Sequence, residues 1–177
     1  MHISHKTQSR LETTTAVVFG CGNILLGDDG FGPAVIEQLR QANLPESVRA
    51  IDAGTAIREY LLDYLMLPAL RPAMLIVVDA WSAEGDAPGQ VRQCVPADLP
   101  VQKTHDFSLH QFPTVNLLAE LEEETGIEVV LIIARTASIP DRIEPGLSPV
   151  MRAAVDTACT RILRIVRPYT ALEETTS

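Results

Sequence analysis

Buried-strand patterns alternate with helical patterns along most of this chain, and this alternation constrains the fold more than any other feature. The strand patterns are short, apolar and rich in β-branched residues. They cover 15–20, 48–52, 74–80, 90–95 and 129–134, and the helical patterns cover 31–43, 56–67, 114–124 and 147–166. Strands that alternate with helices form βαβ units. We therefore expect an α/β fold: a three-layer sandwich in which a mostly parallel, five-stranded, twisted sheet carries helices on both faces.

Some of these elements have recognisable ends or faces. The segment 90–95 alternates between apolar and polar residues, which is typical of an edge strand. Ser148 is the expected N-cap of the last helix, and Pro149 is its expected first residue. The apolar stripe of this helix is predicted to face the sheet and consists of Met151, Val155, Ala158, Ile162 and Ile165.

The length of 177 residues suits a single domain with a sizeable core. The ends are polar, so we expect an N-terminal tail over 1–14, one α/β domain over 15–167 and a C-terminal tail over 168–177. We expect a monomer.

Charge and cysteine content exclude several classes of protein. The net charge of −9 argues against nucleic acid as a partner. Cys21, Cys94 and Cys159 lie far apart and form no C-x-x-C pair, which favours a reducing compartment. The first residues lack the apolar segment of a signal peptide, and the apolar runs are too short to span a membrane. We expect a soluble, cytoplasmic protein that binds neither nucleic acid nor membranes.

A glycine-rich loop, FGCGNILLGDDGFG at 19–32, follows the first predicted strand. The dinucleotide-binding fingerprint needs a glycine where Leu25 stands, and the P-loop pattern needs Lys and Ser or Thr where Asp28 and Asp29 stand. Two carboxylates would repel a polyanion. The EF-hand spacing of acids is also absent. The loop is therefore interpreted as one that presents carboxylates, and a nucleotide-binding domain is disfavoured.

Asp28 and Asp29 are adjacent, so we expect their side chains to point in different directions. One is expected to cap the helix that begins near Phe31, which leaves the other free for chemistry. The alternative is that both simply cap and solvate a turn.

Asp79 ends an apolar strand, where a carboxylate is costly unless it is paired, hydrogen-bonded or bound to a metal. A helix cap or a buried hydrogen-bond acceptor is the alternative. In a sheet ordered 2-1-3, the first and third strands are neighbours at the topological switch point. That order would bring Asp28 and Asp29 close to Asp79.

His105 and His110 lie in THDFSLHQF, just before a predicted helix. Two carboxylates and one histidine would form an open site for a divalent transition metal, although a capping or solvated histidine fits the spacing equally well. Cys21 is a candidate nucleophile, but a buried packing role is the simpler reading because no histidine is tied to it in the sequence.

Five blocks of the sequence, in order from 16 to 166, resemble the hydrogenase maturation endopeptidases. VFGCGNILLGDDGFGPAVIEQL resembles the opening motif G-x-G-N-x-L-x-x-D-[DE]-x-x-G, and IDAGT is similar to the second motif, D-G-G-T. LIVVDAWSAEGDAPGQV resembles the strand that ends in D-A, SLHQF matches the S-x-H segment, and GLSPVMRAAVDTA resembles the closing G-L-[ST]-P helix start. The first block is the most specific of the five.

The resemblance implies an endopeptidase that removes the C-terminal extension of a nickel–iron hydrogenase large-subunit precursor once nickel is in place. The nickel-loaded precursor would be the partner, and its nickel would be recognised by Asp29, Asp79 and His110. Zn²⁺ or Cd²⁺ would substitute for nickel in vitro. Asp29 and Asp79 are the catalytic candidates, and which of them acts as general base stays open.

Three further residues belong to the predicted site. They are Asp28 of the opening motif, Asp52 of the second motif and His105, the rival of His110 for the histidine position. The alternative function is a chaperone or binding module for hydrogenase assembly that senses nickel without cutting the precursor.

Overall fold

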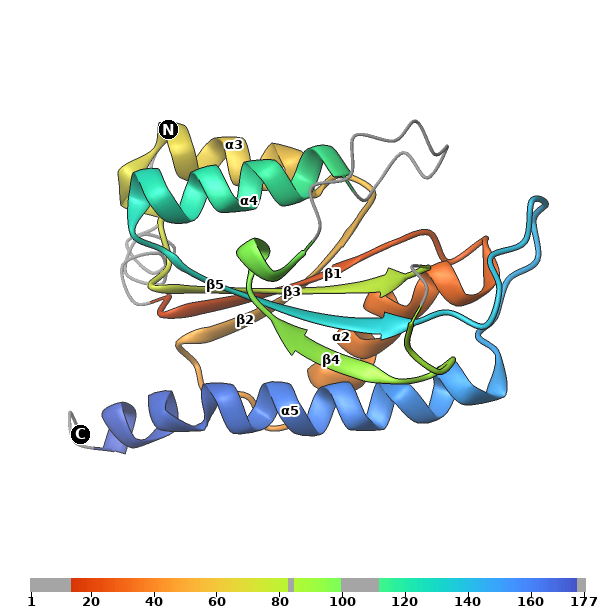
Figure 1. The fold of residues 1–177 in the computed structure, drawn as a ribbon. Helices are drawn as coiled ribbons and strands as arrows, with labels where there is room; N and C mark the ends of the chain where they lie inside the picture. Colours follow the sequence, from red (N-terminus) through yellow and green to blue (C-terminus); the bar gives the residue numbers. More distant parts are fainter. Residues whose placement is uncertain (1–13, 83–84, 100–111, 175–177) are drawn as a thin grey trace, which may run out of the picture.

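The sheet has the predicted architecture. The computed structural model describes residues 14–82, 85–99 and 112–174, and within them a five-stranded sheet has the order β2-β1-β3-β5-β4 (Figure 1). The parallel strands are β1 (Ala16–Cys21), β2 (Val48–Gly54), β3 (Met74–Trp81) and β5 (Glu128–Arg135). The edge strand β4 (Val91–Cys94) is antiparallel to β5. The edge position of the 90–95 segment is confirmed, and the order 2-1-3, the stated condition for bringing the loop acids near Asp79, is the order observed.

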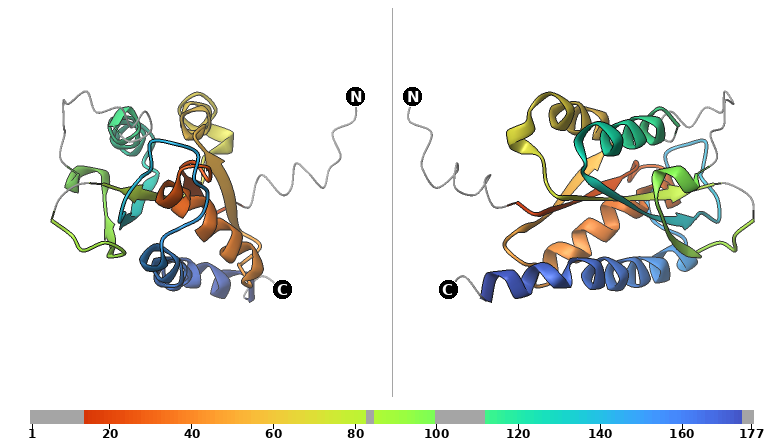
Figure 2. Two further views of the ribbon diagram at one scale, coloured as in Figure 1. Left: turned by 90° about the vertical axis from the view of Figure 1, so that its right-hand side faces the viewer. Right: turned by 60° about the vertical axis from the view of Figure 1, so that its left-hand side comes forward.

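Helices cover both faces of the sheet, which confirms the three layers. Figures 1 and 2 show α2 (Phe31–Gln41) and α5 (Pro149–Glu174) on one face, and α3 (Ile57–Met66) and α4 (Phe112–Thr125) on the other. Short 3₁₀ turns are η1 (Gly27–Gly30), η2 (Pro68–Leu70) and η3 (Pro96–Asp98). No helix in the described parts of the chain is both long and apolar enough to cross a membrane.

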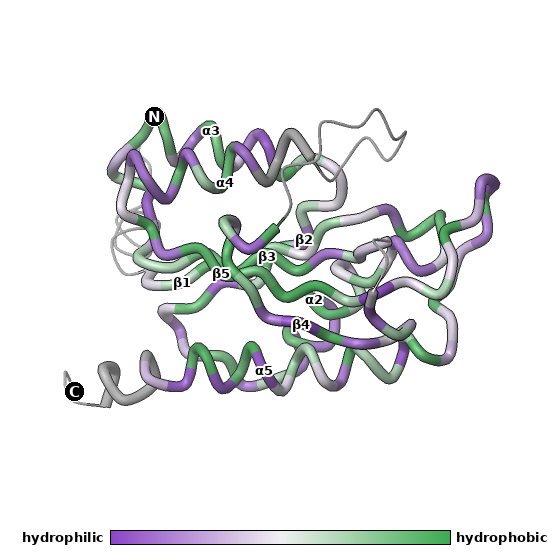
Figure 3. The backbone as a smooth tube through the Cα atoms, viewed as in Figure 1, coloured by the Kyte–Doolittle hydropathy of each residue, from purple (hydrophilic) through white to green (hydrophobic). Residues whose placement is uncertain are grey.

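The core is divided into two layers by the period-two alternation of the strands. Val18 and Ile76 pack with α2 and α5, whereas Phe19 and Leu75 pack with α3 and α4. Figure 3 shows the central strands as a mostly hydrophobic band between helices with mixed surfaces. By the same alternation, Asp79 of β3 lies on the α3/α4 face of the sheet, in line with Val77 and Trp81.

The last helix starts as predicted and ends later than predicted. It begins at Pro149, and the backbone N–H of Met151 donates to the Ser148 hydroxyl at 3.4 Å. The sequence prediction ended this helix at residue 166, before Pro168, but the structure continues it to Glu174. A proline disturbs only its own turn, so a helix can continue beyond it. The division of the chain into two tails and one domain stays a prediction.

Candidate active site

The candidate residues gather where the parallel strands end. β2 lies on one side of β1 and β3 lies on the other. The topological switch point of the sheet is therefore at the carboxyl ends of β1 and β3. The loop after β1 and the 136–148 loop after β5 lie side by side here (Figure 1). Gly27 N–H donates to the Glu144 carbonyl at 2.9 Å, and Glu144 N–H donates to the Leu25 carbonyl at 2.9 Å. Two segments far apart in the sequence therefore form one rim.

Asp29 is held by the turn of its own loop. Gly22 has φ of +121°, and a Cβ there would lie 1.8 Å from the Asp29 carbonyl oxygen, so only glycine fits this close approach. Asn23 follows directly, and its backbone N–H donates to Asp29 Oδ2 at 2.7 Å. The Asp29 side chain is 7% exposed. One carboxylate oxygen is thereby fixed by the backbone, and no described residue donates to the other.

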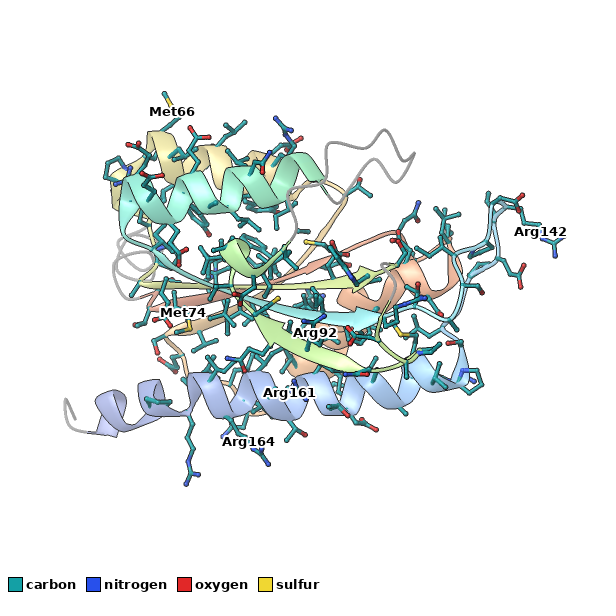
Figure 4. The ribbon with its side chains drawn as sticks, viewed as in Figure 1. Met66, Met74, Arg92, Arg142, Arg161 and Arg164 are labelled. Atoms are coloured by element: carbon teal, nitrogen blue, oxygen red, sulfur yellow. The ribbon has the colours of Figure 1, made fainter. Side chains whose placement is uncertain are left out.

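Asp28 is an internal anchor and does not cap α2. The first position of that helix has no side-chain cap, so this expectation was wrong. Instead, Asp28 is 2% exposed and accepts from Ala137 N–H at 2.9 Å, Ser138 N–H at 3.4 Å, Ser148 N–H at 2.7 Å and Ser148 Oγ at 3.1 Å. This carboxylate therefore ties the opening loop to the 136–148 loop and to the start of α5. Arg142 projects from the tip of the 136–148 loop (Figure 4).

We expect the Asp28→Asn variant to lose about 2–4 kcal/mol of unfolding free energy, because an amide group would face backbone donors and leave them unsatisfied. Urea unfolding measures this loss. Ser148→Ala is the matched control, since it removes one hydroxyl and the helix cap, and it should cost about 1 kcal/mol. Parental stability of Asp28→Asn would contradict the anchoring role.

Asp79 lies near the end of β3, the strand beside β1, and the η1 turn that carries Asp29 follows β1. Burial raises the pKa of Asp79 from 3.8 to about 7, the hydrogen bond from Ala80 N–H lowers it, and the negative charge of Asp29 raises it. The Ala80 N–H donates to Asp79 Oδ1 at 2.8 Å. Asp79 therefore resembles Asp29 in having one oxygen fixed by a backbone N–H. The predicted proximity of Asp29 to Asp79 is consistent with this electrostatic interaction, whereas Asp28 is bound by the 136–148 loop instead.

Cys21 lies beside the carboxylates and is a poor nucleophile. Burial raises the pKa of its thiol well above the ordinary value, and the charges of Asp79, Asp52 and Asp29 raise it further. A protonated thiol reacts slowly. Cys21 packs with Phe19 and other residues of the α3/α4 layer, which agrees with the packing interpretation.

Asp52 lies at the end of β2, beside Gly20 of β1 in the sheet register. Its Oδ1 accepts from Gly54 N–H at 3.0 Å, and its side chain is exposed. The alternation of β2 places Asp52 on the α2/α5 face, opposite to Asp79. Asp29 and Asp79 therefore lie at the same end of the neighbouring strands β1 and β3, and Asp52 lies at that end on the other face.

His105 and His110 lie outside the described residues, so the histidine part of the site stays a prediction. Among the described residues, no group of three or more His, Cys, Asp or Glu side chains is arranged to hold a metal ion. The described part of the chain supplies two carboxylates at the ends of neighbouring strands, and carboxylate oxygens can bind a cation or polarise water.

Sequence reasoning missed the residues that hold these carboxylates. They are Asn23 and Ala80, which act through their backbone N–H groups, and Ala137, Ser138 and Ser148, which bind Asp28. Ser148 was recognised only as a helix cap. The backbone donors carry no signal in the sequence, because any residue except proline supplies the same N–H group.

A family model and individual relatives of this chain carry the same description. The family model HycI, described as hydrogenase maturation protease, matches residues 33–165 and so begins just after the opening loop. A protein of Methanocaldococcus jannaschii assigned as a hydrogenase maturation protease is 38% identical over 83% of this chain and 93% of its own length. The hydrogenase 2 maturation protease of Escherichia coli is 32% identical over 85% of this chain and 90% of its own length.

A solved structure shares the fold as well as the sequence pattern. The hydrogenase maturating endopeptidase HybD from E. coli superposes with a TM-score of 0.66 and is 32% identical. The similarity covers 87% of this chain and 93% of that structure.

Proposed function

The chain belongs to the hydrogenase maturation protease family, and from that premise we infer that it removes the C-terminal extension of a nickel–iron hydrogenase large-subunit precursor after nickel insertion. The observation that supports this proposal is that Asp29 and Asp79 lie at the ends of the neighbouring strands β1 and β3, at the switch point of the sheet, where the charge of Asp29 raises the pKa of Asp79. Family membership supports the reaction class, and the position of the two carboxylates is the reason for proposing them as its site.

We propose that the nickel of the precursor is recognised by Asp29, Asp79 and His110. Asp29 Oδ2 and Asp79 Oδ1 already accept backbone hydrogen bonds, so each carboxylate is oriented before the substrate arrives. Their remaining oxygens are hard donors suited to a divalent ion, and an imidazole would complete an open set of ligands. His110 is assigned by its match to the S-x-H segment.

The chemistry would follow from placing the scissile bond beside this cation. A bound metal ion polarises a carbonyl oxygen, and a carboxylate next to it can accept a proton from the attacking water. Cys21 has no part in the proposal, because its thiol stays protonated at neutral pH. The nickel is a component of the substrate here, and Zn²⁺ or Cd²⁺ as its substitutes in vitro stay a prediction.

Incubation with nickel-loaded and nickel-free large-subunit precursors, followed by intact-mass measurement, tests this function. We expect loss of a C-terminal peptide from the nickel-loaded precursor alone. Binding of the loaded precursor without any change in its mass would instead support the nickel-sensing chaperone.

The histidine assignment is tested by two variants in the same assay. His110→Ala should reduce processing far more than His105→Ala, since only His110 has the register of the S-x-H segment. The reverse order would assign the histidine role to His105.

A further inference from the structure

A pocket of about 320 Å³ opens beside the η1 turn that carries Asp29, on the α2 side of the opening loop. Its walls are apolar at Ile24, Pro33, Ala34 and Leu147, and they carry two acids, Glu37 and Asp52. The η1 turn that presents Asp29 also lines the pocket through Gly27 and Gly30. The pocket therefore adjoins the proposed nickel site but lies on the opposite face of the sheet from Asp79.

The two acids of this pocket have no cation beside them in the described chain. The ion pairs of the described residues are Arg92 with Asp86 and Arg142 with Glu144. Glu37 accepts a long hydrogen bond from the Gln41 amide at 3.5 Å, and Asp52 accepts from the Gly54 backbone. Apolar walls with two unpaired carboxylates are complementary to a long side chain that ends in a positive charge.

Exposed apolar side chains surround the mouth of this pocket. Ile24 is 60% exposed, Leu25 is 43% exposed, and Ile143 of the neighbouring loop is 73% exposed. The backbone hydrogen bonds of Glu144 with Leu25 and Gly27 hold the two loops together, so these side chains share one rim. Exposed apolar side chains around a pocket are typical of a protein–protein contact.

We propose that this pocket docks a lysine or arginine side chain of the hydrogenase precursor, with apolar residues of the precursor on the surrounding rim. The proposal rests on the proposed function for the identity of the partner. The aliphatic stem would lie along Ile24, Pro33 and Leu147, and the cationic group would meet Glu37 and Asp52. The docked residue would lie on the other side of the η1 turn from Asp79, so the pocket anchors the precursor away from the reacting bond.

The chemistry of the pocket is tested with two small probes on the isotopically labelled full chain. N-acetyl-arginine amide should shift the NMR signals of Gly30, Glu37, Asp52 and Gly146, whereas N-acetyl-norleucine amide, which lacks the charge, should bind far more weakly. Glu37→Gln and Asp52→Asn should each weaken binding of the arginine probe about twofold to fivefold, as expected for a partly exposed ion pair. Glu128→Gln, an exposed acid at the start of β5, is the matched control and should bind like the parent.

The identity of the partner is tested by measuring the Kd of the nickel-loaded precursor. Glu37→Gln should raise this Kd about twofold to fivefold at low salt, with a smaller effect at high salt, and Glu128→Gln should not. Equal binding of the two probes, or an unchanged precursor Kd in Glu37→Gln, would overturn the docking proposal. Because the parent chain would still cleave the precursor in that case, this failure is distinct from failure of the proposed function.

Discussion

We expect the Asp79→Asn variant to lose processing of the nickel-loaded precursor and to unfold no more readily than the parent chain. Asparagine keeps the shape of the side chain and can still accept the Ala80 N–H, but it removes one of the two convergent negative charges. A charge in this partly buried position costs stability in the absence of a cation. Loss of function without loss of stability is the signature of a residue kept for chemistry.

The stability difference between Asp79→Asn and the parent should depend on pH. The native pKa of about 7 lies above the value of 3.8 for a free aspartate, so between these values the native parent binds more protons than the unfolded chain. Its stability therefore falls as pH rises through this window. The advantage of Asp79→Asn should be small near pH 4 and nearly complete above pH 7, on the order of 4 kcal/mol for a pKa that moves from 3.8 to about 7.

Urea unfolding at the two ends of this pH range, alongside the processing assay, separates the two roles of Asp79. Asp63→Asn is the matched control, because Asp63 is an exposed aspartate on α3, and it should match the parent in both measurements. If Asp79→Asn unfolded the chain, or processed the precursor at the parental rate, Asp79 would be structural.

The second large effect is expected for Gly20→Val, which should destabilise the fold by about 3 kcal/mol or more. A Cβ at Gly20 would lie 2.4 Å from the Gly32 carbonyl oxygen and 2.4 Å from Ile36 Cγ1. The end of β1 and the first turn of α2 therefore touch through backbone atoms, and a valine would force them apart. Since a whole domain is stable by about 5–15 kcal/mol, much of the protein should be unfolded or insoluble.

The reason for this sensitivity differs from the one suggested by the sequence. A glycine between a strand and a loop suggests a sharp turn, but Gly20 is paired within β1 and has no positive φ. Gly126→Ala is an informative comparison, because Gly126 has φ of +73° and open space around it. It should cost only about 1 kcal/mol from the left-handed backbone alone. Equal melting of Gly20→Val and the parent would contradict the close contact of β1 with α2.

The alternation of short, apolar, β-branched runs with segments of helical spacing predicted the fold, because such runs are typical of buried strands and the spacing is typical of helices. It predicted a mostly parallel sheet and an edge strand at 90–95, and the structure shows that this edge strand is antiparallel to β5. It also predicted acids at the ends of strands, because a carboxylate that follows an apolar run is costly to bury without a partner. The motif spacing predicted the family, which the comparisons confirm.

The tertiary structure alone decided what each acid does. Asp28 and Asp29 are neighbours in the sequence, yet one is bound by residues more than a hundred positions away and the other by Asn23. Side-chain direction in this loop depends on the backbone of Gly22 and on the 136–148 loop packed against it. Local spacing cannot encode such partners, because they meet only when the sheet brings the ends of β1 and β5 to one edge.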